Sequence, residues 1–230
     1  MEHKFLKRNS NKRLLLLFAG WGSDACLFTA EPPEGYDFLL CYEYTTAGLD
    51  SSLLKEYESI VLIGWSLGVW AAEEFFSSLK ERRMVEFEYK IALNGTPFPK
   101  DDLFGIPKAV FEGTLKNFSP FNLLKFRKRM CGSREELNYY NNNLPLRDES
   151  SLYKELVAIN CRVGGRKQGS AGPFWDFACI GERDLIFPAA NQLACWEERG
   201  VKSRLFKGAA HYDHTLFEKL IHGDIIWKRR

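Results

Sequence analysis

The chain lacks the features that mark several large classes of protein. Its six cysteines are spread over 230 residues and form no Cys-x-x-Cys pair, which argues against a disulfide framework and a metal site. The apolar run nearest the N-terminus covers residues 14–19, too short for a signal-peptide core or a membrane span. Because 32 basic residues face 30 acidic ones, the net charge of +2 gives no general attraction to nucleic acid or membranes. We therefore expect a soluble, cytoplasmic protein.

Short apolar runs alternate with helical patterns along most of the chain, as in a mostly parallel sheet with crossover helices. With 45% hydrophobic residues, residues 1–230 are long enough to bury the core of a single α/β domain. The segment Asn9-Ser10-Asn11 favours a turn, so the first two strands are expected to form an antiparallel hairpin. The predicted strands are residues 3–8, 13–19, 37–44, 59–65, 90–95, 175–181 and 202–207, and the predicted helices are 67–80, 189–199 and a segment from His214 onward.

The alternation stops between Pro97 and Pro173. This stretch contains several prolines, an asparagine run at 141–143, a glycine-rich loop (VGGRKQGSAG) and short amphipathic pieces. It carries 13 Lys and Arg residues against 8 Asp and Glu, a local charge of +5 that leaves −3 for the rest of the chain. We predict that residues 97–173 form a small cap inserted over the sheet.

One serine stands where a predicted strand meets a helix, in Gly64-Trp65-Ser66-Leu67-Gly68. In this context the G-x-S-x-G pattern predicts a nucleophile elbow, a strained turn that presents a serine hydroxyl at the carboxyl end of a sheet. The small residues on either side let the strand and helix backbones pass close together. The N–H of Leu67 would then point at developing oxyanion charge. The alternative is a chance pentapeptide on a buried turn.

A serine nucleophile needs a base, and the chain has four histidines. His211 directly follows the last predicted strand and three small residues, Gly208 to Ala210, which leave room for an imidazole at the sheet edge. His214, within the predicted final helix, is the alternative base. His3 and His222 are expected to be structural or exposed.

The base must in turn be oriented by a carboxylate. Asp184 follows the predicted strand 175–181 through a short loop, so it is the acid best placed at the carboxyl end of a strand. Asp176 begins that strand and is expected at the opposite end, whereas Glu182 and Asp213 remain competitors. The chain order Ser66, Asp184, His211 is that of the α/β-hydrolase fold.

A second oxyanion donor is expected after an early strand. Gly20-Trp21-Gly22 supplies a flexible turn there, and the Trp21 N–H is the candidate. A glycine-rich turn with a packing tryptophan is the alternative interpretation.

These motifs together resemble one family, the BioG-type pimeloyl-[acyl-carrier protein] methyl ester esterases. The resemblance spans nearly the whole chain and is weakest at the aspartate and in the insertion. The segments that carry it are Ala-Gly-Trp-Gly (19–22), LLCYEYTT (39–46), Gly-Trp-Ser-Leu-Gly (64–68) and GAAH (208–211).

The resemblance implies an α/β-hydrolase that removes the methyl group from pimeloyl-[acyl-carrier protein] methyl ester in biotin synthesis, releasing methanol. It implies Ser66 as nucleophile, His211 as general base and acid, and Asp184 as the orienting carboxylate. It also implies Trp21 and Leu67 as oxyanion donors. No cofactor or metal is required.

The basic segment Lys125-Phe126-Arg127-Lys128-Arg129 offers separate information about a partner. An acyl carrier protein is acidic, so a basic cap beside an apolar channel suits its docking through Lys125, Arg127, Lys128 and Arg129. A solvated helix face is the alternative. Nucleic-acid binding is disfavoured because the neighbouring Phe111, Phe118 and Phe121 are expected to be buried and no recognition motif is present.

Two other functions stay open from the sequence. A small-molecule carboxylesterase or a thioesterase would keep the same three catalytic residues, because all of these enzymes run acyl transfer. A catalytically inactive binding module is disfavoured because the serine, acid, histidine and Gly-Trp-Gly turn are all present.

Overall fold

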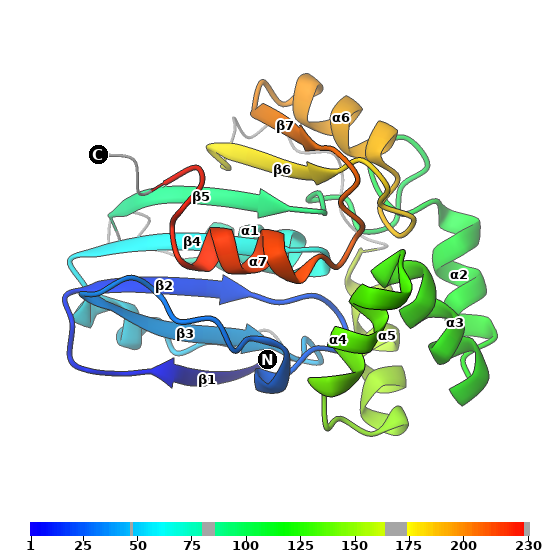
Figure 1. Ribbon diagram of the computed structural model, residues 1–230, viewed down its shortest axis with the longest axis horizontal. Helices are drawn as coiled ribbons and strands as arrows, with labels where there is room; N and C mark the ends of the chain where they lie inside the picture. Colours follow the sequence, from blue (N-terminus) through cyan, green and yellow to red (C-terminus); the bar gives the residue numbers. More distant parts are fainter. Residues whose placement is uncertain (47, 80–85, 164–173, 228–230) are drawn as a thin grey trace.

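The computed structural model describes residues 1–46, 48–79, 86–163 and 174–227, which build a seven-stranded sheet (Figure 1). The strand order is β1-β3-β2-β4-β5-β6-β7, and every described neighbouring pair is parallel except β1 with β3. This confirms the prediction of a mostly parallel α/β sheet. The strands are β1 (Glu2–Lys7), β2 (Arg13–Phe18), β3 (Tyr36–Tyr42), β4 (Ser59–Trp65), β5 (Phe87–Leu93), β6 (Phe177–Gly181) and β7 (Lys202–Phe206).

The expected opening hairpin is wrong. β1 pairs with β3, where Phe5 lies opposite Leu39, while β2 lies between β3 and β4. The physical reason is burial: β2 is buried at every position after Arg13 and needs a neighbour on each side, whereas the largely exposed β1 suits the sheet edge. The turn after β1 is fastened to β3 by Asp37, whose Oδ1 accepts hydrogen bonds from the backbone N–H groups of Asn9 and Asn11.

Helices cover both faces of the sheet (Figure 1). They are α1 (Leu67–Ser78), α6 (Ala189–Glu198) and α7 (His214–Ile221), in agreement with the predicted segments, and two short 3-10 helices, η1 (Ala25–Leu27) and η2 (Ser51–Glu56), lie in the connections. On one face Trp65 of β4 meets Phe217 of α7 with ring centroids 4.9 Å apart, and on the other Phe18 meets Phe75 of α1 at 6.0 Å. In the described ranges, no helix combines the length and apolar character needed to cross a bilayer.

The segment expected to form a cap contains four helices in its described part. Its helices α2 (Lys108–Lys116), α3 (Pro120–Cys131), α4 (Arg134–Asn142) and α5 (Glu149–Val163) lie together beyond the carboxyl ends of the strands, at the right of Figure 1. The glycine-rich loop at 164–173 lies outside the described residues.

Buried polar contacts fasten these helices to the sheet. The Trp21 Nε1–H donates to the Leu152 carbonyl at 2.9 Å, and the Tyr44 N–H donates to Glu155 at 2.9 Å. Glu155 is fully buried and pairs with Arg147 at 2.6 Å. A buried carboxylate without such partners would be strongly destabilising, so these contacts fix α5 over the strand ends.

Candidate active site

Ser66 occupies a strained turn between β4 and α1. Its φ of 57° and ψ of −126° lie outside the regions that side-chain-bearing residues prefer. The flanking glycines are required by close approach: a Cβ on Gly68 would lie 2.0 Å from the Phe18 carbonyl oxygen, and one on Gly64 would lie 2.9 Å from the Cα of Val69. The G-x-S-x-G spacing therefore reflects backbone crowding that holds the serine at the end of β4.

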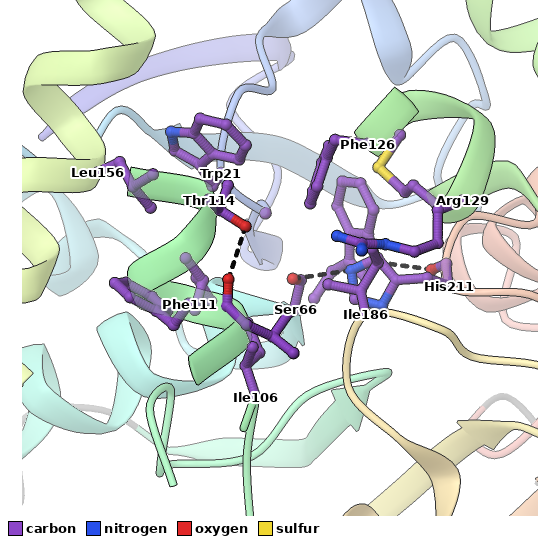
Figure 2. A pocket seen from close by; sticks show the side chains of 15 residues that line it. Trp21, Ser66, Ile106, Phe111, Thr114, Phe126, Arg129, Leu156, Ile186 and His211 are labelled. Carbon is purple, nitrogen blue, oxygen red and sulfur yellow. Dashed lines mark hydrogen bonds between the residues drawn. The ribbon is translucent and has the colours of Figure 1, made fainter. Parts of the chain in front are cut away.

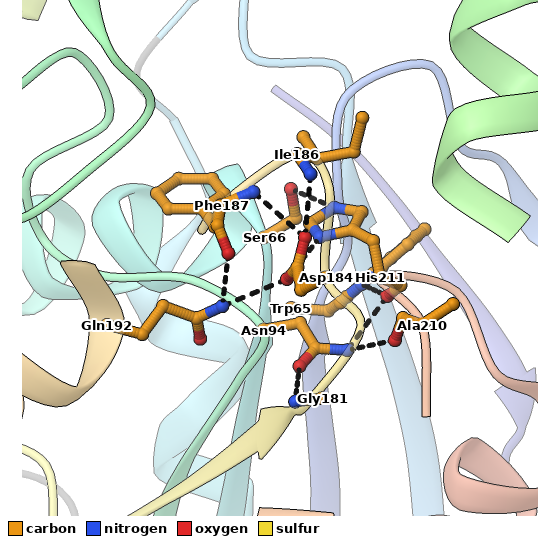
Figure 3. A network of polar contacts seen from close by, with 10 residues as sticks. All are labelled: Trp65, Ser66, Asn94, Gly181, Asp184, Ile186, Phe187, Gln192, Ala210 and His211. Atoms are coloured by element: carbon orange, nitrogen blue, oxygen red, sulfur yellow. Dashed lines mark hydrogen bonds and ion pairs between the residues drawn. The ribbon is translucent and has the colours of Figure 1, made fainter. Parts of the chain in front are cut away.

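The structure brings Ser66, His211 and Asp184 into one hydrogen-bonded chain (Figure 3). The His211 Nε2 lies 2.9 Å from the Ser66 Oγ, and its Nδ1 lies 2.8 Å from the Asp184 Oδ2. All three side chains are buried. An Nδ1–H bonded to the carboxylate leaves the Nε2 lone pair facing the hydroxyl, which is the arrangement a serine nucleophile requires.

The Asp184 carboxylate is itself held firmly. Its Oδ1 accepts hydrogen bonds from the N–H groups of Ile186 and Phe187 at 2.8 and 2.9 Å. Its Oδ2 accepts one from the Gln192 side-chain amide at 2.9 Å, besides the His211 ring. These donors compensate the burial of the carboxylate and fix the oxygen that faces the imidazole.

Three positioning residues were not singled out from the sequence. Asn94 donates from Nδ2 to the carbonyls of Ala210 and His211, both at 2.9 Å, and its Oδ1 accepts from the Gly181 N–H at 2.6 Å (Figure 3). Trp65 donates from Nε1 to the same His211 carbonyl at 3.0 Å. A usable signal existed for Asn94 alone, since this polar residue directly follows the buried apolar end of β5, Ile91 to Leu93.

Gln192, the third of these residues, bridges two parts of the acid loop. Its side-chain amide donates to Asp184 and also, at 2.7 Å, to the Phe187 carbonyl. Nothing in the local sequence of α6 marks this residue.

The other histidines lie in different settings. His214 is the first residue of α7, where its Nδ1 lies 2.8 Å from Glu136 and its ring stacks on Tyr139 at 4.1 Å. His3 is exposed on the edge strand β1, and His222 follows the last turn of α7. Of the described histidines, His211 alone contacts Ser66.

The competing acids have other partners. Asp176 pairs with Lys90 at 2.9 Å at the start of β6, the end of the strand away from Asp184. Glu182 accepts a hydrogen bond from the Gly208 N–H at 2.8 Å. Asp213 caps α7 by accepting from the Leu216 N–H at 2.9 Å.

The two predicted oxyanion donors lie on segments that adjoin Ser66. A Cβ built on Gly20 would lie 3.1 Å from the Ser66 Cβ, so the turn that carries Trp21 passes directly beside the serine. Leu67 is the first residue of α1, and the N–H groups of a first helical turn have no partner within the helix. The Trp21 indole also packs into the cap, edge-on to Phe126 at 5.1 Å, so its side chain has a structural role as well.

An apolar cavity opens at Ser66 between the sheet and the cap (Figure 2). It is bounded by Ser66 and His211 at the strand ends and by cap helices α2, α3 and α5. Its apolar walls include Ile106, Phe111, Phe126, Leu156 and Ile186. Such walls suit a hydrocarbon chain with a single reacting group at Ser66.

The four basic residues of α3 differ in their surroundings. Lys125, Lys128 and Arg129 are exposed, with the Lys125 ammonium 4.3 Å from the Phe121 ring centroid. Arg127 reaches over Tyr140 of α4 at 5.9 Å, and Arg129 lines the Ser66 cavity. Residues four apart lie on one face of a helix, so Lys125 and Arg129 point the same way and line one groove, whereas Arg127 points to a different side.

One expectation about the aromatics is wrong. Phe121 is 65% exposed and Phe118 is half-buried, although Phe111 is buried. Phe121 is the second residue of α3 and lies on the outward side of that helix, as does Leu124, which is 52% exposed.

Comparisons with known proteins place the chain in a family. Residues 1–226 match the family model described as pimeloyl-ACP methyl esterase BioG. The chain is 41% identical over 211 residues to a malonyl-[acyl-carrier protein] O-methyltransferase of Bacteroides fragilis, covering 90% of this chain but only 41% of that protein. It is 34% identical over 218 residues to an uncharacterized protein of Haemophilus influenzae, covering 94% of each.

Solved structures support the same family and fold. The crystal structure of BioG from Haemophilus influenzae matches with a TM-score of 0.86 at 33% identity, over 99% of this chain and 100% of that one. An esterase from Exiguobacterium antarcticum matches with a TM-score of 0.62 at 14% identity, over 95% and 93% of the two chains, which shows a shared fold. With its mostly parallel sheet and its serine at a strand-to-helix turn, the chain has the α/β-hydrolase fold and belongs to the BioG family of pimeloyl-ACP methyl esterases.

Proposed function

We propose that the chain is a cytoplasmic serine esterase that hydrolyses the methyl ester of pimeloyl-[acyl-carrier protein] in biotin synthesis. The observation that carries the proposal is the buried Ser66–His211–Asp184 hydrogen-bond chain at the end of an apolar cavity. Membership of the BioG family supports the substrate.

In the first half of the reaction the Ser66 Oγ attacks the carbonyl carbon of the methyl ester while the His211 Nε2 takes the hydroxyl proton. The N–H groups of Trp21 and Leu67 stabilise the negative charge on the former carbonyl oxygen. When the tetrahedral intermediate collapses, the bond to the methoxy oxygen breaks. His211 returns its proton to that oxygen, and methanol leaves.

In the second half, His211 takes a proton from water, and the resulting hydroxide attacks the acyl-enzyme carbonyl. The bond to the Ser66 Oγ then breaks as the oxygen regains a proton from His211. A free carboxyl group remains at the end of the pimeloyl chain, and its thioester link to the carrier is untouched. Throughout, Asp184 keeps His211 in one tautomer and stabilises the imidazolium.

The exposed face of α3 supports a carrier-protein partner. Two exposed apolar residues, Phe121 and Leu124, alternate there with the exposed cations Lys125 and Lys128. Such a face is complementary to an acidic amphipathic helix. We propose that the carrier docks on α3 through Lys125, Arg127, Lys128 and Arg129.

The Bacteroides fragilis relative offers a chemical argument for the same substrate. Its name describes transfer of a methyl group onto a carrier-bound malonyl group. An enzyme that removes a methyl ester from a carrier-bound acyl chain would reverse that protection at a later stage, so the two activities are complementary.

Labelling by a fluorophosphonate tests the catalytic assignment. The reagent reacts only with a serine that an adjacent base activates, so wild type should be labelled and Ser66→Ala should not. His211→Ala should also abolish labelling. The matched control is His214→Ala, which removes a histidine that contacts Glu136 and should keep most of the labelling. Loss of labelling in His214→Ala with retention in His211→Ala would overturn the assignment.

A charge reversal tests the partner. The double variant Lys125→Glu/Lys128→Glu should lower kcat/KM for the carrier-linked ester on the order of tenfold at low salt, and much less for a small methyl ester. Added salt should reduce the wild-type advantage. The control is Lys55→Glu/Lys202→Glu, which makes the same change of charge at exposed positions away from the cap. Equal losses on both substrates would mean a structural role, and no loss on either would favour a small-molecule esterase.

A further inference from the structure

Arg129 is the charged side chain of the cavity wall that has no acidic partner in the described part of the chain. Arginines 8, 147, 162 and 199 each pair with a glutamate, but no described carboxylate lies within ion-pair distance of Arg129. It stays partly exposed to solvent. Burial lowers its pKa below the usual value for arginine, yet a guanidinium remains protonated at neutral pH.

The other polar side chains of the cavity are already engaged. The Thr114 hydroxyl donates to the Val110 carbonyl at 2.9 Å (Figure 2). The Trp21 and Trp65 indoles donate to the carbonyls of Leu152 and His211. Arg129 therefore brings N–H donors to a cavity whose remaining wall is apolar.

Arg129 also stands at a boundary. A groove between α2 and α3 is lined by Asn117, Asn122 and Lys125. It shares Trp21, Val110, Thr114, Phe126 and Arg129 with the Ser66 cavity. Arg129 therefore lies on the wall that the groove and the Ser66 cavity have in common. The guanidinium carbon lies 5.9 Å from the Phe126 ring centroid, which limits the positions the side chain can take.

From this placement we propose that Arg129 is a specificity-determining residue, which binds a carbonyl or carboxylate oxygen at the end of the acyl chain opposite the reacting ester. The cavity then selects chains that carry oxygen at both ends over chains with a plain hydrocarbon tail. In the carrier-linked substrate the bound oxygen is that of the thioester carbonyl. The inference depends on the proposed ester hydrolysis at Ser66.

The physical reason is the cost of an unsatisfied group. A hydrocarbon tail lying against Arg129 displaces water from the guanidinium without replacing its hydrogen bonds, whereas a carbonyl oxygen restores one of them. A hydrogen bond to a charged donor at a partly exposed site is worth on the order of a tenfold preference.

Three small methyl esters of equal chain length test the proposal. Methyl heptanoate has no distal oxygen, dimethyl pimelate has a neutral distal ester, and monomethyl pimelate has a distal carboxylate. Wild type should show a kcat/KM, counted per ester group, on the order of tenfold higher for dimethyl pimelate and monomethyl pimelate than for methyl heptanoate. Arg129→Met should lose most of this preference, and Arg129→Lys should keep it in part for monomethyl pimelate. Arg134→Met, which removes an exposed arginine at the start of α4, should behave as wild type.

The outcomes separate this inference from the proposed function. Hydrolysis of all three esters without preference, abolished by Ser66→Ala, would overturn the role of Arg129 and leave the chemistry intact. Equal losses on all three esters in Arg129→Met would likewise overturn it, because they would indicate a structural role. Ester hydrolysis that survives in Ser66→Ala would instead contradict the proposed function.

Discussion

Replacing Asn94 with alanine removes three buried hydrogen bonds that position the segment carrying His211. Asn94 is 1% exposed and joins β5 to the carbonyls of Ala210 and His211 and to the N–H of Gly181. The His211 carbonyl keeps the Trp65 Nε1–H as a donor. The Gly181 N–H and the Ala210 carbonyl lose the side-chain partner that Asn94 provides.

A buried backbone group without a partner costs about 1 to 3 kcal/mol, so two such groups predict a loss of unfolding free energy of about 2 to 6 kcal/mol. For a chain of this size that corresponds to a Tm lower by about 4 to 24 °C. The backbone at Asn94 has φ +46°, so alanine also adds strain there. Asn94→Gly, which loses the same hydrogen bonds without that strain, should be about 1 kcal/mol more stable than Asn94→Ala.

Urea unfolding and the Tm measure the stability, and kcat on a small methyl ester should fall on the order of 10- to 100-fold because His211 loses part of its support. The control is Asn141→Ala, an exposed position on α4 that should change stability by less than about 0.5 kcal/mol. If Asn94→Ala were within that same margin of wild type, the Asn94 contacts would not support the histidine segment and the reasoning would be refuted.

Three further predictions concern the acid, the elbow and the buried ion pair. Asp184→Asn should lower kcat on the order of 10³- to 10⁴-fold with little change in KM, since an amide at this place favours the wrong tautomer of His211. Gly68→Ala should prevent folding or cost more than about 3 kcal/mol of stability, because its Cβ would lie 2.0 Å from the Phe18 carbonyl oxygen. Gly113→Ala, whose Cβ would have no atom within 4 Å, should stabilise α2 by up to about 1 kcal/mol. Equal Tm values for these two variants would contradict this prediction. Burial raises the pKa of the Glu155 carboxyl group, so this group keeps its proton to a higher pH in the folded state than in the unfolded chain. The unfolding free energy of wild type relative to Glu155→Gln should therefore fall as pH rises through the range just above the usual glutamate pKa. If urea unfolding showed this free-energy difference rising with pH, the predicted sign would be wrong.

The sheet and the three site residues were predictable because their signals are local. Apolar runs such as Leu14 to Leu17 mark buried strands, and a small residue on each side of Ser66 marks a turn where two backbones approach closely. Asp184 and His211 both follow predicted strands, and the carboxyl ends of parallel strands meet at one edge of the sheet.

The features that escaped prediction depend on contacts between distant segments. The partner of β1 is chosen by which strand has a free edge, so a turn-forming sequence at Asn9 to Asn11 was misleading. Asn94 acts on carbonyls more than a hundred residues further along the chain, and no pattern around it specifies them. Of the four cations of α3, Lys125, Lys128 and Arg129 are exposed and Arg127 is half-buried, a difference that the helical repeat could have indicated because Arg127 is two residues from both Lys125 and Arg129.

The measurement that tests the central claim most directly is mass spectrometry of pimeloyl-[acyl-carrier protein] methyl ester incubated with wild type and with Ser66→Ala. Wild type should convert the carrier-bound methyl ester to the carrier-bound free acid, release methanol and leave the thioester intact. Ser66→Ala should retain far less than about 1% of this rate, since loss of a triad nucleophile costs on the order of a million-fold. Cleavage of the thioester, an unchanged methyl ester with wild type, or comparable turnover by Ser66→Ala would contradict the account.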